Sequence, residues 1–496
     1  MTGNRRMRSA TAALAALMMS AALVPASAQD LDLGTLPVDG KFGDVTLRIS
    51  AIAGPYADGF KKFEKEIREE LGIQMEFELI PPTEAFTKDM LEFRSQSASS
   101  DIVLFMPANL ADYSRFLVPL DKAAEQLGLS FEKDDIEAVY RNVYTTWGGT
   151  MYSIPWDGDQ HNLFYNKAVF ADETNQAEFK AKYGYDLAPP KTWAEYKDIA
   201  EFMNGRDING DGTPDYGVAE AWQRGGYAVW WWTNKFAANG GVWFDADMKP
   251  LINSESGVKA LQNSIDIRDF APPGVLNFGY PELEAALLKQ QVPMVIQWSS
   301  TGKAAQSKDV SDIVGNVGIA MVPGTKLADG TIVHRPALPT GWAAGVPLFS
   351  KNAAAAVSLL AWISTPERSL ELALDPGTAV DAWRASAFAN VDAWKAAFPE
   401  DPTYGEAFIN VQRETVLTGL PDLQIPGSAE YLTALDREIG AALAGEKSAK
   451  EALDAAAAAW EAITDKLGRE AQAAAWANQA AAMESIGIRY EPTWAQ

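Results

Sequence analysis

The sequence predicts an α/β protein with two lobes, and three observations carry this prediction. The chain has 496 residues, whereas a single hydrophobic core rarely grows beyond about 300 residues. Patterns typical of strands alternate with patterns typical of helices in both halves of the chain. No low-complexity linker separates the halves, so we expect several strands to cross between the lobes and to act as a hinge.

The N-terminal part alternates between strand and helix patterns. Apolar residues alternate in the segments predicted as strands, and they recur on one face in the segments predicted as helices. The expected elements are a strand over 45–52, a helix over about 57–71, a strand over 73–79, a helix over about 83–95 and a strand over 101–105. This βαβαβ order indicates a parallel sheet covered by helices.

The second half of the chain carries helix start signals and further strands. Thr192 with Glu195 and Ser448 with Glu451 form capping-box patterns, in which each side chain satisfies a backbone N–H of the first helical turn. The apolar run 292–298 is expected to form a strand, and the Ala-rich C-terminal region is expected to form amphipathic helices. The second half is therefore also predicted to mix helices and strands.

The composition excludes several classes of function. The chain has no cysteine and only two histidines, so disulfides, thiolate nucleophiles, cysteine-bound zinc and iron–sulfur clusters are excluded. Its formal net charge of −24 argues against nucleic acid and anionic lipid as partners, because both require clustered Lys and Arg.

The first residues predict export. Three arginines precede an apolar run over 10–24, and the small residues at 25–28 form a cleavage pattern that places the cut between Ala28 and Gln29. We therefore expect residues 1–28 to be a cleavable signal peptide and the mature protein to be periplasmic. The Arg5-Arg6 pair leaves twin-arginine export open as the alternative route.

An enzymatic function finds little support in the motifs. The sequence contains no G-x-S-x-G elbow, H-E-x-x-H helix or G-x-G-x-x-G fingerprint. Residues 299–303 resemble the end of a Walker loop, but Gln297 stands where the first glycine is required. A glycosidase that uses a carboxylate pair stays open as the alternative function, because the 66 acidic residues offer many candidate pairs.

The sixteen tryptophans suggest carbohydrate binding. Several stand beside polar residues or glycine, where an aromatic face and nearby hydrogen-bonding groups suit a sugar; they are Trp156, Trp222, Trp243, Trp298, Trp342 and Trp383. The alternative is that these side chains fill the core. Three consecutive tryptophans over 230–232 cannot all face one core in a helix or a strand, so at least one should be exposed or at a site.

The segment 207–215 resembles a calcium-binding loop. Oxygen-bearing side chains fall at positions 1, 3, 5 and 9 around a glycine turn, and a backbone carbonyl is expected at position 7. Val218 stands at position 12, where a bidentate carboxylate is needed, so Glu220 is the candidate to supply it. We expect a structural Ca²⁺ and no catalytic cofactor, with the ligands Asp207, Asn209, Asp211, Thr213, Asp215 and Glu220; the alternative is a turn closed by Asx hydrogen bonds.

Phrases along the chain resemble the extracellular solute-binding proteins of ABC importers, family 1, the class of the maltose-binding protein. They occur in family order at 154–159, 163–170, 190–195, 292–299 and 338–342. The resemblance implies a two-lobed periplasmic binding protein fold of the type II-like kind. Each lobe is then expected to hold a mostly parallel sheet flanked by helices, with the ligand cleft between the lobes. We expect the first lobe to comprise 29–153 plus 300–345, and the second to comprise 154–299 plus 346–496 with a helical C-terminal extension.

The resemblance also nominates residues for the cleft, which the family builds from loops after strands and from aromatic platforms. They are Tyr56, Asn109, Trp156, Asp157, Asp159, Trp222, Gln223, Arg224, Trp231, Trp298, Ser299, Gly341, Trp342, Trp383 and Arg384. The implied function is a receptor, not an enzyme, that captures a sugar, oligosaccharide or polyol and docks as a monomer on an ABC permease in the inner membrane. A calcium-dependent adhesin or lectin is a further alternative.

Overall fold

The computed structural model describes residues 33, 35–97, 99–338 and 341–488. The predicted signal peptide, residues 1–28, lies outside this range. Within the described part of the chain, no helix combines the length and the apolar character that crossing a membrane requires.

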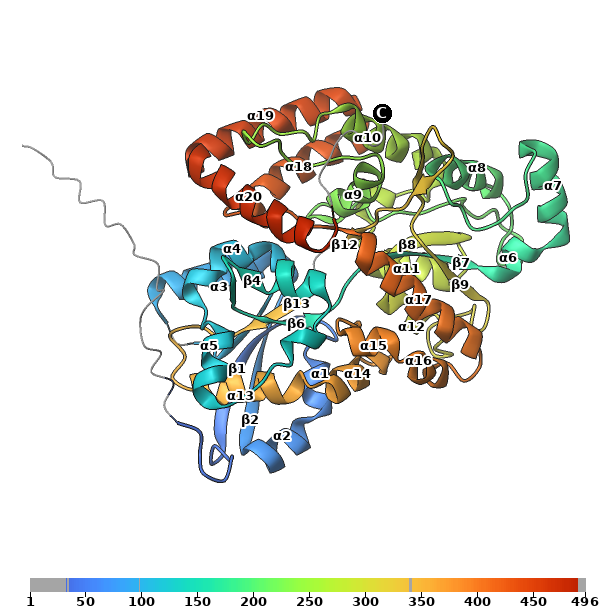
Figure 1. The fold of residues 1–496 in the computed structure, drawn as a ribbon. Helices are drawn as coiled ribbons and strands as arrows, with labels where there is room; N and C mark the ends of the chain where they lie inside the picture. Colours follow the sequence, from blue (N-terminus) through green and yellow to red (C-terminus); the bar gives the residue numbers. More distant parts are fainter. Residues whose placement is uncertain (1–32, 34, 98, 339–340, 489–496) are drawn as a thin grey trace, which may run out of the picture. The chain divides into compact units, whose positions relative to one another are not determined.

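The strands predicted near the N-terminus form three of the five strands of the first sheet (Figure 1). β1 (Val45–Ile52) pairs in parallel with β2 (Ile73–Ile80) and β3 (Ile102–Phe105). β13 (Trp342–Gly345) pairs with β3 and with β6 (Ile154–Asp157), both in antiparallel fashion. The strand order is β2-β1-β3-β13-β6. β13 runs against its neighbours because it brings the chain into this sheet from the second lobe, whereas β6 takes the chain out.

Helices cover the first sheet, as the alternating pattern predicted. The expected helix over 57–71 is divided at Phe63 into α1 (Asp58–Lys62) and α2 (Glu64–Leu71). α13 (Ala353–Ile363) lies along β1 in Figure 1 and packs against it. The remaining elements here are α3 (Pro82–Ser95), η1 (Pro107–Asn109), α4 (Leu110–Tyr113), η2 (Ser114–Phe116), α5 (Leu120–Leu127), η3 (Lys133–Asp135), the π-helical turn η4 (Tyr140–Tyr144), β4 (Thr146–Trp147) and β5 (Thr150–Met151).

The second sheet differs from the prediction of a mostly parallel sheet. β7 (His161–Asn166) lies between β8 (Met294–Trp298) and β9 (Val317–Ala320), and both pairs are antiparallel. β7 begins only a few residues after β6, so the chain passes almost directly from the first sheet into the second. The sequence pattern identified β8 as a strand but could not give the direction of its partners.

Capping boxes start two helices at the predicted places. Thr192 and Glu195 cap α8 (Trp193–Met203), and Ser448 and Glu451 cap α19 (Ala449–Leu467). The other helices around the second sheet are α6 (Lys167–Ala171), α7 (Glu173–Tyr183), α9 (Tyr227–Ala238), α10 (Glu255–Ile267), α11 (Tyr280–Leu288), α12 (Ser300–Ala304), α16 (Val391–Ala397) and α17 (Pro402–Thr418).

The chain crosses between the lobes at different residues from those predicted. The segment 300–345 was assigned to the first lobe, but β9 in that segment belongs to the second sheet. The segment from residue 346 onward was assigned to the second lobe, but α13 packs on β1. β6 likewise belongs to the first sheet. The predicted lobe boundaries differ from the observed ones because the sequence pattern shows where a strand lies but not which of the two sheets it joins.

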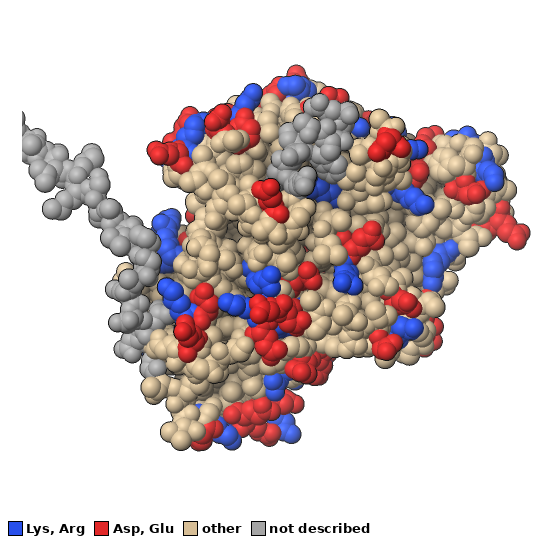
Figure 2. Space-filling model, in the orientation of Figure 1, with Lys and Arg blue, Asp and Glu red and all other residues tan. Residues whose placement is uncertain are grey.

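The C-terminal region is helical, as predicted. α18 (Ser428–Leu443) packs against α9 and α19, and α19 packs against α10 and α20 (Arg469–Ser485). In the face shown in Figure 2, acidic and basic side chains are interspersed over these and neighbouring elements. The connecting elements are β10 (Thr325–Lys326), β11 (Ile332–Val333), β12 (Ala337–Leu338), β14 (Leu420–Pro421), α14 (Pro366–Leu374) and α15 (Ala385–Ala389).

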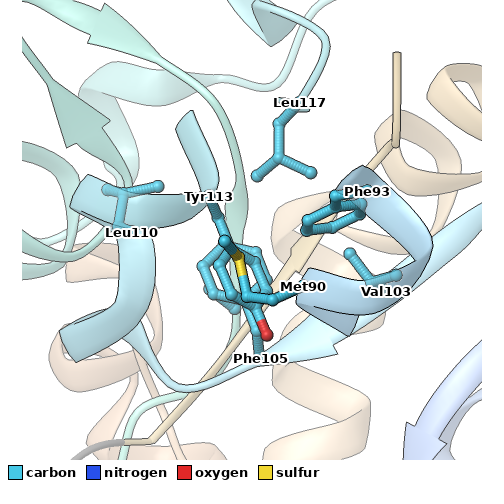
Figure 3. Packing of buried hydrophobic residues seen from close by; sticks show 8 residues of the cluster. Met90, Phe93, Val103, Phe105, Leu110, Tyr113 and Leu117 are labelled. Carbon is cyan, nitrogen blue, oxygen red and sulfur yellow. The ribbon is translucent and has the colours of Figure 1, made fainter. Parts of the chain in front are cut away.

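A hydrophobic cluster beneath the first sheet supports one wall of the candidate site (Figure 3). The Tyr113 ring packs edge-on against Phe93, with 5.1 Å between ring centroids, and lies 4.9 Å from the ring of Phe105. Phe105 ends β3 and Tyr113 ends α4, so this cluster fixes the turn that follows the strand.

We expect Phe93→Ala to lower the free energy of unfolding by about 3–5 kcal/mol, because it removes a buried ring and leaves a cavity. Phe93 is 2% exposed, whereas Leu91 in the same helix is 65% exposed. Urea denaturation of Phe93→Ala and of the control Leu91→Ala measures the difference. Equal losses in the two variants would contradict the role given to the cluster.

Candidate functional site

The candidate site is a cleft at the carboxyl ends of β1, β2 and β3. Residues 53–56 follow β1, Pro82 follows β2 and Met106 follows β3, and all of them line a cavity of about 570 Å³. A second cavity of about 440 Å³ shares six of its lining residues, so the two form one continuous cleft. The shared residues are Pro82, Met106, Arg224, Gly225, Trp230 and Trp342. Crevices at the carboxyl ends of strands are the usual ligand sites of α/β sheets.

Aromatic side chains line both walls of the cleft. On the first lobe, the Tyr56 and Trp342 rings lie 5.5 Å apart. On the second lobe, Trp298 contacts Tyr227 at 5.9 Å and Trp230 at 5.7 Å, both edge-on. Tyr280 lies 6.0 Å from the Trp298 ring. Trp298 is therefore the centre of an aromatic platform formed by Tyr227, Trp230, Tyr280 and Trp298, all of which line the cleft.

The buried side of the platform is held by His161. His161 is paired with Trp298 across β7 and β8, with 4.8 Å between their rings. The Asn234 side chain lies 2.8 Å from His161 Nδ1. Burial lowers the pKa of His161 to about 3, so its imidazole is neutral and packs as an aromatic ring. Trp231, which is fully buried, contacts Trp298 at 5.2 Å from the same side.

A buried ion pair anchors the loop that carries Gln223 and Arg224. Lys235 Nζ contacts both carboxylate oxygens of Glu220, at 2.7 and 2.8 Å. The indole N–H of Trp222 donates to the same carboxylate at 3.1 Å. Because both charges are almost completely buried, the pair fixes the start of the loop relative to α9.

Three buried carboxyl groups meet where the chain crosses between the lobes. One oxygen each from Asp157, Asp159 and Asp381 lies within 4.8 Å of the others. Burial and the neighbouring carboxylates raise the pKa of Asp157 and of Asp159 well above the usual range. Lys303 Nζ lies 3.6 Å from Asp381 and provides positive charge. Carboxylates this close could hold a cation, and Asp159 presents the cluster to the cleft.

The structure brings only part of the nominated set to the cleft. The residues that line it are Tyr56, Asn109, Asp159, Gln223, Arg224, Trp298 and Trp342. Of the three consecutive tryptophans, Trp230 lines the cleft and the other two are buried in α9. This agrees with the expectation that at least one of the three tryptophans would lie at a site.

The other nominated residues lie behind the cleft. Ser299 donates to Asp381 at 2.8 Å, and the backbone of Gly341 packs against the Asp157 carbonyl. Arg384 donates to the Phe131 carbonyl at 3.0 Å and therefore holds the backbone. None of the nominated residues Trp156, Asp157, Trp222, Trp231, Ser299, Gly341, Trp383 and Arg384 is among the described residues that line the two cavities. The large side chains among them fill the interior: Trp156, for example, stacks on Phe60 at 3.9 Å.

Several cleft residues had no signal in the sequence. Tyr280 starts α11, and Asp436 lies inside α18, far along the chain from the other cleft residues. Asp422 follows β14 and lines the smaller cavity. These residues reach the site only because segments that are distant in the sequence pack together in the fold.

The loop over 207–215 closes on itself through hydrogen bonds. Asp207 accepts from the N–H groups of Gly210 and Gly212, and Asp215 accepts from those of Ile208 and Asn209. Glu220 is not available to complete a calcium site, because its carboxylate is buried against Lys235. Calcium binding by Asp207, Asn209, Asp211, Thr213 and Asp215 stays a prediction, without Glu220.

Known proteins resemble this chain in sequence and in fold. Residues 53–368 match the family model of bacterial extracellular solute-binding proteins. The "Probable amino-acid ABC transporter periplasmic-binding protein" of Sinorhizobium fredii is 25% identical over 368 residues, which cover 73% of this chain and 78% of the relative. The sn-glycerol-3-phosphate-binding periplasmic protein of Agrobacterium fabrum is 28% identical over 214 residues, or 41% of this chain and 43% of the relative.

A solved structure extends the likeness to the fold. The ABC transporter solute-binding protein of Agrobacterium radiobacter K84, in complex with ribitol, superimposes with a TM-score of 0.71 at 21% identity, covering 85% of this chain and 100% of that one. The fold is thus that of the two-lobed solute-binding proteins. Because the family match spans more than half of its residues, the chain belongs to the bacterial extracellular solute-binding proteins. The predicted family and the two-lobed α/β fold are confirmed.

We expect Lys235→Met to destabilise the protein by about 3–5 kcal/mol, because it leaves the Glu220 carboxylate buried without its partner. The double variant Lys235→Met/Glu220→Gln removes both charges and should recover most of the loss. Urea denaturation measures both changes. A single variant as stable as the wild type would contradict the anchoring role of the pair.

If the loop over 207–215 binds calcium, EDTA should lower the melting temperature by several degrees and added Ca²⁺ should restore it, because a cation that binds only the folded state stabilises it. Differential scanning fluorimetry measures the shift, and Asp207→Asn provides the control that should no longer respond. An identical melting temperature with and without EDTA would contradict calcium binding.

Proposed function

We propose that the protein is a periplasmic receptor of an ABC importer that closes its lobes around a small neutral carbohydrate, such as a sugar or a sugar alcohol. One observation carries the proposal: aromatic faces on both walls of one cleft surround a few polar groups. Tyr56 and Trp342 stand on the first lobe and Trp230 and Trp298 on the second. A sugar or polyol presents C–H faces to such rings and hydroxyl groups to the polar residues.

The polar groups of the cleft suit hydroxyl groups. Asp159 offers a carboxyl oxygen at the crossing between the lobes, and Gln223 and Arg224 are exposed on the opposite wall. A carboxylate accepts hydrogen bonds, a carboxamide both donates and accepts, and a guanidinium donates several. The ribitol complex of the structural neighbour supports a polyol as the ligand class.

We expect closure of the two lobes to be the conformational change that transport requires. The chain passes from β6 in the first sheet to β7 in the second through 158–160, and the connecting segment around Asp381 and Ala382 lies against this crossing. Bending at these short connections would bring the two aromatic walls together and exclude water from the ligand. The closed form would then dock on the membrane permease, as a monomer and without chemical turnover of the solute. Removal of the predicted signal peptide after Ala28 would place the mature protein in the periplasm.

The experiment that tests the proposal is a screen of ligands followed by calorimetry. Sugars, sugar alcohols, uronic acids and amino acids are added to the mature protein, and we expect a neutral carbohydrate to raise the melting temperature. Titration calorimetry should then give one binding site per chain. A rise caused by amino acids alone would contradict the carbohydrate class, and release of reducing sugar from an oligosaccharide would favour the glycosidase alternative.

We expect Asp159→Asn to weaken binding of the ligand found in that screen by about 2- to 10-fold, because the amide cannot make the same set of hydrogen bonds as the carboxyl group and one hydrogen bond contributes about 0.5–1.5 kcal/mol. Asp186→Asn is the matched control, since Asp186 is exposed and pairs with Lys180 away from the cleft. Titration calorimetry compares the two affinities. Equal affinities would remove Asp159 from the binding site.

A further inference from the structure

We propose that Asp436 makes the cleft selective for neutral ligands by occupying the anion-binding position before α9, so that phosphorylated and other acidic solutes are rejected. This inference rests on the proposed function. It adds that the solute bound in the cleft carries no negative charge.

The first step is the position of the Asp436 carboxylate. Its two oxygens accept hydrogen bonds from the backbone N–H groups of Gly225 and Gly226, each at 3.1 Å. Both glycines have a φ of 112°, a conformation that other residues rarely adopt. Successive N–H groups that point to one place form a concavity for anions, and the N-terminus of a helix adds a favourable dipole. The anion that occupies this position is the carboxylate of Asp436, a side chain of the protein itself.

The second step is the rigidity of this arrangement. Asp436 is 6% exposed and projects from α18, a helix that packs against α9. The carboxylate and the two N–H groups are therefore held by helices that are packed together. A phosphate or carboxylate of a ligand could reach these donors only by displacing a side chain that already satisfies them.

The third step is the balance of charge around that place. Arg224 is the sole Lys or Arg among the described residues that line the cleft, and the Asp436 carboxylate lines the same smaller cavity. Carboxylates in a partly buried cleft repel an incoming anion more strongly than they would in water, because the surrounding protein screens charge less. Arg224 lines the smaller cavity together with Asp436, and its positive charge acts on the Asp436 carboxyl group, so a ligand anion would compete with a carboxylate for it.

The experiment uses inorganic phosphate and sn-glycerol 3-phosphate as probes, titrated by calorimetry into the mature protein and its variants. The wild type should bind neither probe measurably. Asp436→Ala frees the two N–H groups and removes the charge, and it should bind both probes with an affinity at least about 10-fold above the detection limit that bounds the wild type, which corresponds to a gain of about 1.4 kcal/mol or more. Asp436→Asn, which keeps the shape of the side chain, should show a smaller gain and serves if the alanine variant does not fold.

The matched control is Asp422→Ala, which removes another buried aspartate side chain from the same cleft but leaves the N–H groups bound to Asp436. We expect no gain in phosphate binding for this variant. A wild type that binds either probe as tightly as Asp436→Ala would overturn the inference, as would an equal gain in Asp422→Ala. If no sugar or polyol binds the wild type while Asp436→Ala still acquires phosphate binding, the proposed function fails and the role of Asp436 stands.

Discussion

The crossing at Asp157, Gly158 and Asp159 is the constraint on which the rest of the structure depends. A side chain at Gly158 would place its Cβ 2.1 Å from the Ala382 carbonyl oxygen, so the two connecting segments can pass each other only at a glycine. The backbone N–H of Asp381 donates to Asp157 at 2.7 Å and joins these segments. The same close approach gathers three carboxyl groups beside the cleft. The geometry of the hinge and the polarity of the site therefore have one origin.

The two walls of the cleft are supported by different physical means. On the first lobe, Tyr113 and Phe105 line the smaller cavity and also belong to the hydrophobic cluster beneath the sheet. On the second lobe, the loop with Gln223 and Arg224 is held by charges: the Glu220–Lys235 pair at its start and Asp436 at its end. Replacing a loop residue that faces the cleft need not disturb either support, so the ligand contacts could change in evolution without loss of the fold.

The sequence predicted local features well and long-range ones poorly. The βαβαβ order and the capping boxes at Thr192 and Ser448 depend on neighbouring residues, and they were found where expected. Nominated aromatics such as Trp156 and Trp231 proved to be buried, because a tryptophan beside polar residues can still face the interior. Asp436 could not have been nominated, since its partners Gly225 and Gly226 lie 211 and 210 residues away in the chain. Which sheet receives a strand, and which loops share a cleft, are decided by packing between distant segments.

The neutral state of His161 has a consequence for the conditions in which the protein can work. A histidine of ordinary pKa would gain charge as the surrounding medium acidifies. His161 lies directly behind Trp298, where a positive charge would disturb the packing of the platform. Because burial lowers its pKa to about 3, the support of the platform does not titrate under mildly acidic conditions. The packing of His161 behind Trp298 is thus expected to stay the same in a mildly acidic medium.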